Sequence, residues 1–497
     1  MSINFIPNDP LAGPKAPRMR SQKPAKNRPA NRAGFTFHDP EPEKPYDPGT
    51  PGFLFWQCRE AALAAAATWE RHAGPLTRWQ QGRRRLNLYQ NAVQQLGSDP
   101  DLNAFYDRDG FQFFEFDDGK KKTLSGTSTD VVAHEVGHGL LDSIRPDLWD
   151  TPFLEVGAFH EAFGDCMALL TALGDQATSK ALRGIGLGVR NFVETTAEDL
   201  SDSIRRLQPE HNAAAPRHAL NKLRWQLPSS LPSDGGPGEL INEGHSFAQV
   251  FTGCLWDLVR NLLGSATTAG ALEAAVKTAA GLLIAGAEAA PEGARFFQAV
   301  GRAMVLADDE QHAGAHHVAI RDAFDAHGVA LGSSAMLAPL AALAGPSPTV
   351  TKVAAALSAT TRRDLMGRLG LPAKARMVLR RREIGGERVV QAVHRREVPL
   401  GGLTPKLKGV IAMAPESVLV GASGGRAAVL GSLPEPGATT DEVMAYVESL
   451  VKHERIEYGG EQRAAPGRGA RPRWHSHSVR SVAGRKVLTR VRFACGG

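Results

Sequence analysis

A histidine-glutamate motif inside an apolar run constrains this chain more than any other feature of its sequence. The run Val131-Val132-Ala133-His134-Glu135-Val136-Gly137-His138 holds two histidines four residues apart. On an α-helix this spacing points both imidazoles the same way, so that they can bind one metal ion with Glu135 beside it. With 16 histidines in 497 residues, the match is difficult to attribute to chance. The motif therefore predicts a helix here and a fold that brings a further ligand to it.

A second segment can supply that ligand. The run from Gly157 to Asp165 contains Glu161 and Asp165 at helical i, i+4 spacing. Glu161 can be the third ligand after His134 and His138, and Asp165 can accept a hydrogen bond from a ligating imidazole. Two histidines and one glutamate leave a fourth position for water, as in catalytic rather than structural zinc sites. The alternative is that both histidines are core residues whose ring nitrogens are satisfied by backbone carbonyls.

The two segments resemble the zinc-binding helices of the thermolysin-like gluzincin metallopeptidases, the thermolysin and fungalysin type. In this family the first motif often follows Asp-Val-Val, as in Asp130-Val131-Val132, and the second reads Glu-Ala-x-x-Asp, as in Glu161 to Asp165. Upstream, Asn103-Ala104-Phe105-Tyr106 resembles the family's edge strand, and Arg321 to Val329 resembles its last helix. The resemblance covers residues 87 to 330, about half of the chain.

The resemblance implies roles for further residues. Asn103 and Ala104 are expected to bind the backbone of an extended peptide substrate by strand addition. His245, at the start of an amphipathic run, is similar to the family's histidine that donates to the developing oxyanion, and Glu243 is similar to the glutamate that orients it in the fungalysin-like branch. Arg190 is similar to an arginine that holds the substrate carbonyl after the scissile bond. Alternatively, His245 is a capping or core histidine, and Arg190 is an exposed, solvated arginine.

Three departures from the family pattern limit what the resemblance implies. The residue before the third ligand is His160, where thermolysin-like enzymes commonly have Asn. A tyrosine that assists the oxyanion is not evident, because an ungapped count from His138 reaches Trp149. Asp130, a calcium ligand in the family, is kept, but the positions after Asp165 are mostly apolar. We therefore expect one catalytic Zn²⁺ and no calcium.

The implied activity is zinc-dependent hydrolysis of peptide bonds, with Glu135 as the general base that takes the proton of the attacking water. The expected partner is a peptide or protein substrate. One alternative is a catalytically silent scaffold of the same fold that binds peptides or proteins. A metalloaminopeptidase is another alternative, but it would need an acidic anchor for the substrate's α-amine, and no Gly-x-Met-Glu-Asn type segment is present.

The expected fold class is α+β: a thermolysin-like, two-lobed zincin with a small, largely antiparallel N-terminal sheet, a mainly helical lobe and an additional C-terminal α+β module. Residues 1–52, rich in proline with scattered Lys and Arg, are expected to be a disordered arm. Residues 53–345 are expected to be the metallopeptidase domain. Residues 346–497 contain short β-like runs and one helix from Thr440 to His453, and resemble no family that we recognise.

Charge and hydropathy set further expectations. The net charge is only +6, and no nucleic-acid motif accompanies the basic runs near the C-terminus, so nucleic-acid binding is not predicted. The uncharged stretch from Thr278 to Ala287 is shorter than the ~20 residues that cross a bilayer, so a buried helix and no membrane span are expected. No apolar segment typical of a secretory signal follows Met1, which favours a cytoplasmic enzyme or export by another route.

Overall fold

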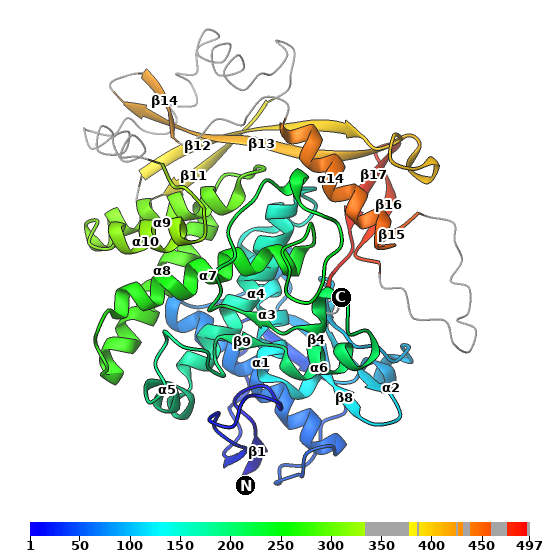
Figure 1. Ribbon diagram of the computed structural model, residues 1–497, viewed down its shortest axis with the longest axis vertical. Coiled ribbons are helices and arrows are strands. Elements are labelled where there is room, and N and C mark those ends of the chain that lie inside the picture. Colours follow the sequence, from blue (N-terminus) through cyan, green and yellow to red (C-terminus); the bar gives the residue numbers. More distant parts are fainter. Residues whose placement is uncertain (333–376, 385–386, 424–425, 431–437, 459–474, 495–497) are drawn as a thin grey trace.

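The two helices that carry the predicted metal ligands, α3 (Thr129–Ile144) and α4 (Leu154–Gly174), pack against each other near the centre of the computed structural model (Figure 1). The structure describes residues 1–332, 377–384, 387–423, 426–430, 438–458 and 475–494. Mixed helices and sheets confirm the α+β class. A small sheet and a helical lobe form the lower part of Figure 1, and a second sheet lies across the top of the lobe.

The N-terminal sheet has five strands in the order β18-β5-β6-β4-β3. Its strands are β3 (Gly34–Phe37), β4 (Arg85–Tyr89), β5 (Ala104–Tyr106), β6 (Gly110–Phe113) and β18 (Phe493–Ala494). The expectation of a largely antiparallel sheet was wrong, because β3 is parallel to β4 and β4 is parallel to β6. Parallel strands need a crossover connection, and helix α1 (Pro51–Ala73) lies in the connection from β3 to β4. Only β5 runs antiparallel to both of its neighbours, β6 and β18.

The helical lobe surrounds α3 and α4. Helix α3 begins at Ser128, whose hydroxyl accepts a hydrogen bond from the amide of Val131, and Asp130 places a negative charge in the first turn. Helix α4 is buried along almost its whole length because α1, α3, α7 and α9 contact it. The other helices are α2 (Ala92–Leu96), α5 (Gln176–Arg183), α6 (Glu198–Leu207), α7 (Gly244–Leu263), α8 (Ala269–Ala289), α9 (Phe296–His312) and α10 (His317–Ala326). Two-stranded sheets pair β1 (Ile3–Phe5) with β2 (Arg20–Gln22), β7 (Glu115–Asp117) with β8 (Lys122–Leu124), and β9 (Thr195–Thr196) with β10 (Arg217–His218).

Glycines set the spacing between α3 and α4. A Cβ atom added at Gly137 of α3 would lie 2.9 Å from the Cα of Gly164 on α4. A Cβ added at Gly164 would lie 2.7 Å from Nδ1 of His134. Both distances are shorter than real Cβ contacts, so the helices can approach this closely only because these side chains are absent. The close approach brings the imidazoles of α3 to the carboxylates of α4.

Residues 1–52 differ from the disordered arm that their composition predicts. Phe35 of β3 is 2% exposed and lies between the rings of Trp79 and Phe111, with centroids 5.6 and 5.8 Å away. Arg28 forms an ion pair of 2.6 Å with Glu70 of α1. The segment is too poor in apolar residues to form a core of its own. It can nevertheless be held by a surface that the rest of the chain provides, which composition alone does not reveal.

Among the described residues of the C-terminal part, a seven-stranded sheet is accompanied by helix α14 (Ala438–Lys452). The strand order is β11-β12-β13-β17-β16-β15, with β14 also paired to β13. These strands are β11 (Met377–Ile384), β12 (Glu387–Pro399), β13 (Val410–Ser423), β14 (Arg426–Leu430), β15 (Ile456–Glu457), β16 (His477–Val482) and β17 (Arg485–Arg490).

This part packs directly on the helical lobe. The hydroxyl of Ser449 donates to the carbonyl of Asn242 at 2.6 Å, and the hydroxyl of Ser417 donates to the carbonyl of Glu292 at 2.9 Å. The apolar core is continuous across this contact. The expected boundary near residue 345 and the basic tract at 463–473 lie outside the described residues, so the boundary stays a prediction.

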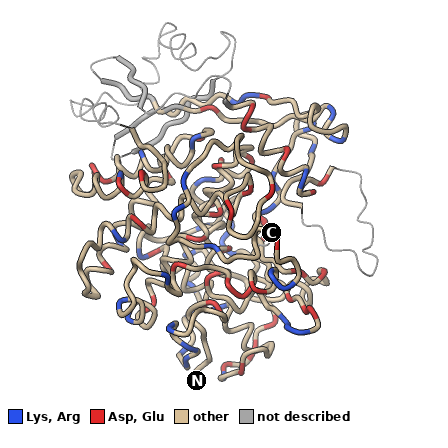
Figure 2. The backbone as a smooth tube through the Cα atoms, viewed as in Figure 1, with Lys and Arg blue, Asp and Glu red and all other residues tan. Residues whose placement is uncertain are grey.

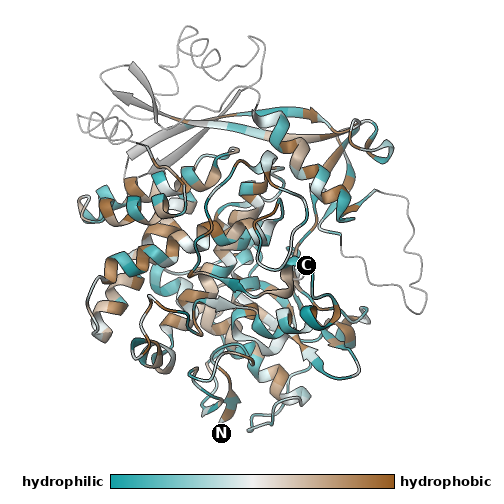
Figure 3. Ribbon diagram, in the orientation of Figure 1, coloured by the Kyte–Doolittle hydropathy of each residue, from teal (hydrophilic) through white to brown (hydrophobic). Residues whose placement is uncertain are grey.

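Helix α8 contains the stretch that we expected to be a buried helix. Its 21 residues are long and apolar enough to cross a membrane by length and composition. Half of the relevant window is buried inside the protein, and a single helix of this kind is weak evidence for a span. Figure 3 shows hydrophobic residues along α8 where it lies against the rest of the lobe, and α8 contacts α7 and α9.

Charged residues of both signs are mixed along the described chain. Figure 2 shows Lys and Arg interspersed with Asp and Glu over the lobes, including the C-terminal part.

The glycine spacing can be tested by substituting Gly164 with Ala. The added methyl would press on His134, and overpacking of this kind typically costs about 1–3 kcal/mol. We expect a lower melting temperature and less than one equivalent of bound zinc, measured by thermal denaturation and metal analysis. Gly270→Ala on α8 is the matched control, because a Cβ there meets nothing within 4 Å. Equal melting temperatures and zinc contents in the two variants would show that the close approach is unimportant.

Candidate metal centre and peptide cleft

Three side chains from α3 and α4 converge on one point. Oε2 of Glu161 lies 3.2 Å from Nε2 of His134 and 3.4 Å from Nε2 of His138. One ligand atom from each of the three residues lies within 4.8 Å of the others, and all three side chains are buried. Two imidazole nitrogens and one carboxylate oxygen are the donor set of catalytic zinc sites, so the residues fit that ion.

Groups behind the three side chains fix their orientation. Asp165 Oδ1 lies 2.8 Å from Nδ1 of His134, and Arg217 forms two further contacts with Asp165 at 2.8 and 2.9 Å. Burial tends to raise the pKa of the Asp165 carboxyl, but Arg217 and His134 outweigh burial and hold the pKa well below its usual range. The carboxylate therefore stays charged and directs Nε2 of His134 toward Glu161.

His160 lies behind the other histidine of the set. Its Nδ1 is 3.2 Å from Nδ1 of His138, and burial lowers the pKa of both imidazoles. Nε2 of His138 faces the carboxylate of Glu161 and its Nδ1 faces the ring of His160, so neighbouring side chains hold both edges of this imidazole. His160, at the position where thermolysin-like enzymes commonly have Asn, thus places a second imidazole against His138.

His245 reaches the same carboxylate from α7. Its Nε2 lies 3.0 Å from Oε2 of Glu161, and its Nδ1 lies 2.9 Å from Oε1 of Glu243. The N-cap of α7 is Glu243, which accepts from the amide of Ser246, so His245 does not cap the helix. Burial tends to lower the pKa of His245, but the carboxylates of Glu161 and Glu243 raise it to about 10.

Glu135 is fully buried on α3, one residue after His134. The candidate base is thus on the same helix as two of the candidate ligands and inside the same buried region. Asn103 and Ala104 are also buried, Ala104 as the first residue of β5.

A cavity of about 530 Å³ opens beside this cluster. Glu161, His245 and Arg217 contribute to its wall, together with residues of the C-terminal part such as Tyr446 and Ala494. The cavity is large enough to hold several side chains of a peptide. The C-terminal part therefore forms one wall of the cleft.

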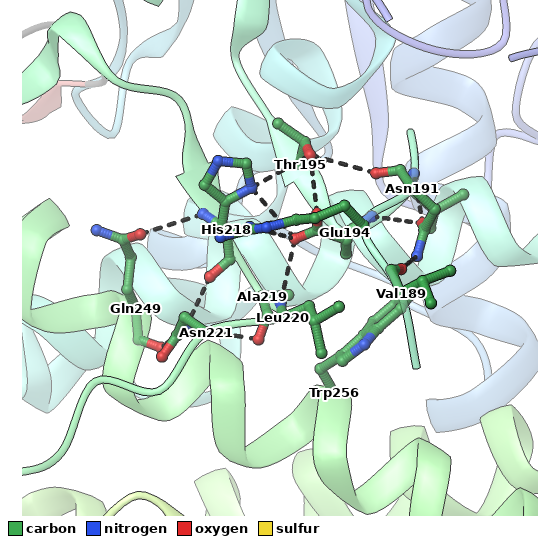
Figure 4. A network of polar contacts seen from close by, with 12 residues as sticks. Val189, Asn191, Glu194, Thr195, His218, Ala219, Leu220, Asn221, Gln249 and Trp256 are labelled. Atoms are coloured by element: carbon green, nitrogen blue, oxygen red, sulfur yellow. Dashed lines mark hydrogen bonds and ion pairs between the residues drawn. The ribbon is translucent and has the colours of Figure 1, made fainter. Parts of the chain in front are cut away.

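Arg217 is one of the polar residues of this wall that the sequence did not single out. Figure 4 shows contacts around strand β10, which contains Arg217: Glu194 approaches Nδ1 of His218 at 3.3 Å, and Gln249 of α7 accepts from the amide of His218 at 3.1 Å. Because Arg217 is the neighbour of His218 in β10, the network fixes the guanidinium beside Asp165. No local pattern marks Arg217, since its partner is 52 residues away in the sequence.

Arg190, the sequence candidate for substrate binding, lies elsewhere. Its side chain is 58% exposed and forms an ion pair of 3.3 Å with Glu194. It is not among the residues that line the cavity.

Two further groups of possible metal ligands occur among the described residues. Asp9, Asp130 and Glu198 form one group, in which burial and the neighbouring carboxylates raise the pKa of Glu198 to about 10. The other group, which lies at the end of α9, consists of Asp308, His312 and His316. Neither group borders the cavity. Asp130 therefore has acidic neighbours that come from distant segments, and the expectation that calcium is absent stays a prediction.

The sequence also matches a known family. A model described as Fungalysin metallopeptidase (M36) matches residues 87–335, which is half of the chain. The chain belongs to the fungalysin metallopeptidase family. This confirms the resemblance and makes the chain a zinc metallopeptidase. The match includes His134, His138, Glu161 and His245, whereas the C-terminal sheet, α14 and β18 lie outside it. A comparison with curated proteins finds no match.

The ligand set predicts the effect of two substitutions on zinc content. His138→Ala should abolish the one equivalent of zinc, because it removes a direct donor. Asp165→Asn should keep partial occupancy, because it weakens only the contact that orients His134, and such changes typically reduce metal affinity ~10–100-fold. Metal analysis after dialysis against a weak chelator measures both. Undiminished zinc in His138→Ala would contradict the ligand set.

Proposed function

We propose that this fungalysin-family chain is an endopeptidase that holds one zinc ion with His134, His138 and Glu161 and uses Glu135 as its general base. The observation that carries the proposal is the convergence of the two Nε2 atoms on Oε2 of Glu161, with Glu135 buried one residue away. A zinc ion in this position would supply Lewis acidity, which lowers the pKa of a bound water toward ~7 and polarises a peptide carbonyl.

The protein's own groups supply the proton transfers. Glu135 takes the proton of the water that attacks the carbonyl carbon and then delivers it to the leaving amine. Its carboxylate is well suited to this task because the buried environment keeps bulk water from competing for the proton.

His245 stabilises the negative charge that develops on the carbonyl oxygen. Glu243 on Nδ1 fixes the ring so that Nε2 is directed into the cluster, where it now contacts Glu161. A donor aimed at the position where charge develops stabilises the transition state more than the ground state. Glu243 is therefore a positioning residue in this proposal.

We assign the contact with a substrate carbonyl to Arg217 rather than to Arg190. Arg217 lies in the wall of the cavity and is held there by Asp165, whereas the Arg190 side chain is mostly exposed and pairs with Glu194. A guanidinium fixed by a buried carboxylate can keep donors pointing into the cleft. Asn103 and Ala104, at the start of β5, remain the proposed site for the backbone of the extended substrate.

Glu135→Gln tests the base. The amide preserves size and hydrogen bonding, so zinc content and melting temperature should not change. Turnover of any substrate found in a peptide library should fall below detection, because an amide cannot take the proton. Equal cleavage by wild type and variant would exclude Glu135 as the base. If the zinc-loaded wild type cleaves none of the peptides, the result would favour a catalytically silent binding scaffold.

Arg217→Met and Arg190→Met test the arginine assignment as a matched pair. Loss of a charged hydrogen bond costs about 1.5–3 kcal/mol, so Arg217→Met should lower kcat/KM roughly 10–100-fold. Arg190→Met should stay close to wild type because its side chain is mostly exposed. Kinetics should be measured on samples with equal zinc content, since Arg217 also contacts Asp165. A larger loss in Arg190→Met would reverse the assignment.

A further inference from the structure

The strand proposed to bind substrate already has a partner. β18 pairs antiparallel with β5, with Phe493 opposite Tyr106 and Ala494 opposite Phe105. β18 thereby becomes the outer strand of the N-terminal sheet, and β5 becomes internal. Figure 1 shows the C-terminal chain leaving the upper sheet and descending to the central region, where C marks its end.

The paired residues lie against the metal centre. The ring of Phe493 is stacked on His160, with centroids 4.0 Å apart, and on His138, with centroids 4.8 Å apart. Phe493 is only 1% exposed. Ala494 lines the same cavity as Glu161 and His245. The segment therefore covers the side of the centre at which an extended peptide paired with β5 would arrive.

The chain just before β18 is tied to the loop between the two ligand helices. The indole Nε1 of Trp149 donates to the carbonyl of Arg490 at 3.0 Å, and the amide of Arg490 donates to Asp150 at 3.0 Å. The guanidinium of Arg490 donates to the carbonyl of Trp149 and to the hydroxyl of Tyr446, and lies 4.1 Å from the centroid of Phe493. These contacts fix a strand that would be too short to pair stably by itself.

We propose that residues 490–494 form an autoinhibitory strand that blocks the path of an extended peptide substrate along β5. The proposal rests on the proposed function of the cleft. β18 pairs with Phe105 and Tyr106, directly after the proposed substrate site at Asn103 and Ala104, so an extended substrate that continued along this edge would meet β18. Because the segment belongs to the same chain, its effective concentration is far above that of a free peptide. Substrate binds only in the fraction of molecules in which the strand has left the edge.

Binding and turnover are measured separately so that the two proposals can fail independently. In the Glu135→Gln background, the affinity of a labelled library peptide is compared with and without Phe493→Ala. Removing the ring should weaken the hold of β18, and the apparent affinity for the peptide should rise at least about tenfold because more molecules have an open edge. This comparison requires no catalysis. With Glu135 intact, Phe493→Ala should raise kcat/KM by a similar factor, mainly through KM.

Two further variants control for folding. Leu283→Ala removes a fully buried side chain of α8 and should lower the melting temperature without changing peptide affinity. Ala494→Pro removes one backbone N–H from β18 and is used as the test variant if Phe493→Ala does not fold. A peptide with the sequence of residues 486–494 should restore inhibition of the opened variant in competition with substrate.

Unchanged peptide affinity in both β18 variants, with zinc retained, would overturn the proposal and make β18 a permanent structural strand. Equal activation by Leu283→Ala would also overturn it. A third outcome separates the two proposals. If the β18 variants bind the peptide more tightly, but neither they nor the wild type cleaves it when Glu135 is intact, the autoinhibitory strand is supported and the endopeptidase assignment is wrong.

Discussion

The cleft depends on a single buried carboxylate that is surrounded by imidazoles. Oε2 of Glu161 lies within 3.4 Å of nitrogens from His134, His138 and His245, which come from two different helices. A buried carboxylate is stable only when it is paired with hydrogen-bonding or charged partners. Burial alone would raise the pKa of Glu161, but the neighbouring imidazoles hold it well below its usual range. The charge of this one group therefore determines how α3, α4 and α7 must be arranged.

The surrounding structure meets that requirement by close packing and by ion pairs. Gly137 and Gly164 allow α3 and α4 to approach, and Asp165 with Arg217 holds His134 from behind. The strand that carries Arg217 is in turn held by the buried Glu194, which contacts His218 and the amide of Leu220 (Figure 4). His134 is thus oriented by Asp165, and Asp165 by Arg217. Preorganisation of this kind lets donors stabilise developing charge without reorganising during the reaction.

The C-terminal part changes how the catalytic lobes present their cleft. It adds one strand to the N-terminal sheet, one wall to the cavity and an aromatic ring against two histidines of the centre. The C-terminal residues that make these contacts lie outside the part of the chain that matches the fungalysin family. If β18 blocks an extended peptide on β5 as proposed, access to the cleft depends on the stability of this short strand.

The sequence by itself determined the family, the α+β class and the ligand candidates, because these depend on local spacing. Two histidines four apart, and an acid pair four apart, point along a helix face whatever the rest of the chain does. The tertiary structure determined the contacts between residues that lie far apart in the sequence. Arg217 meets Asp165 across 52 residues, and Trp149 meets Arg490 across 341. The parallel strands of the small sheet, the ordered N-terminal segment and the occupied edge of β5 likewise arise from contacts between distant segments. Their energies depend on packing partners that no local window of the sequence contains.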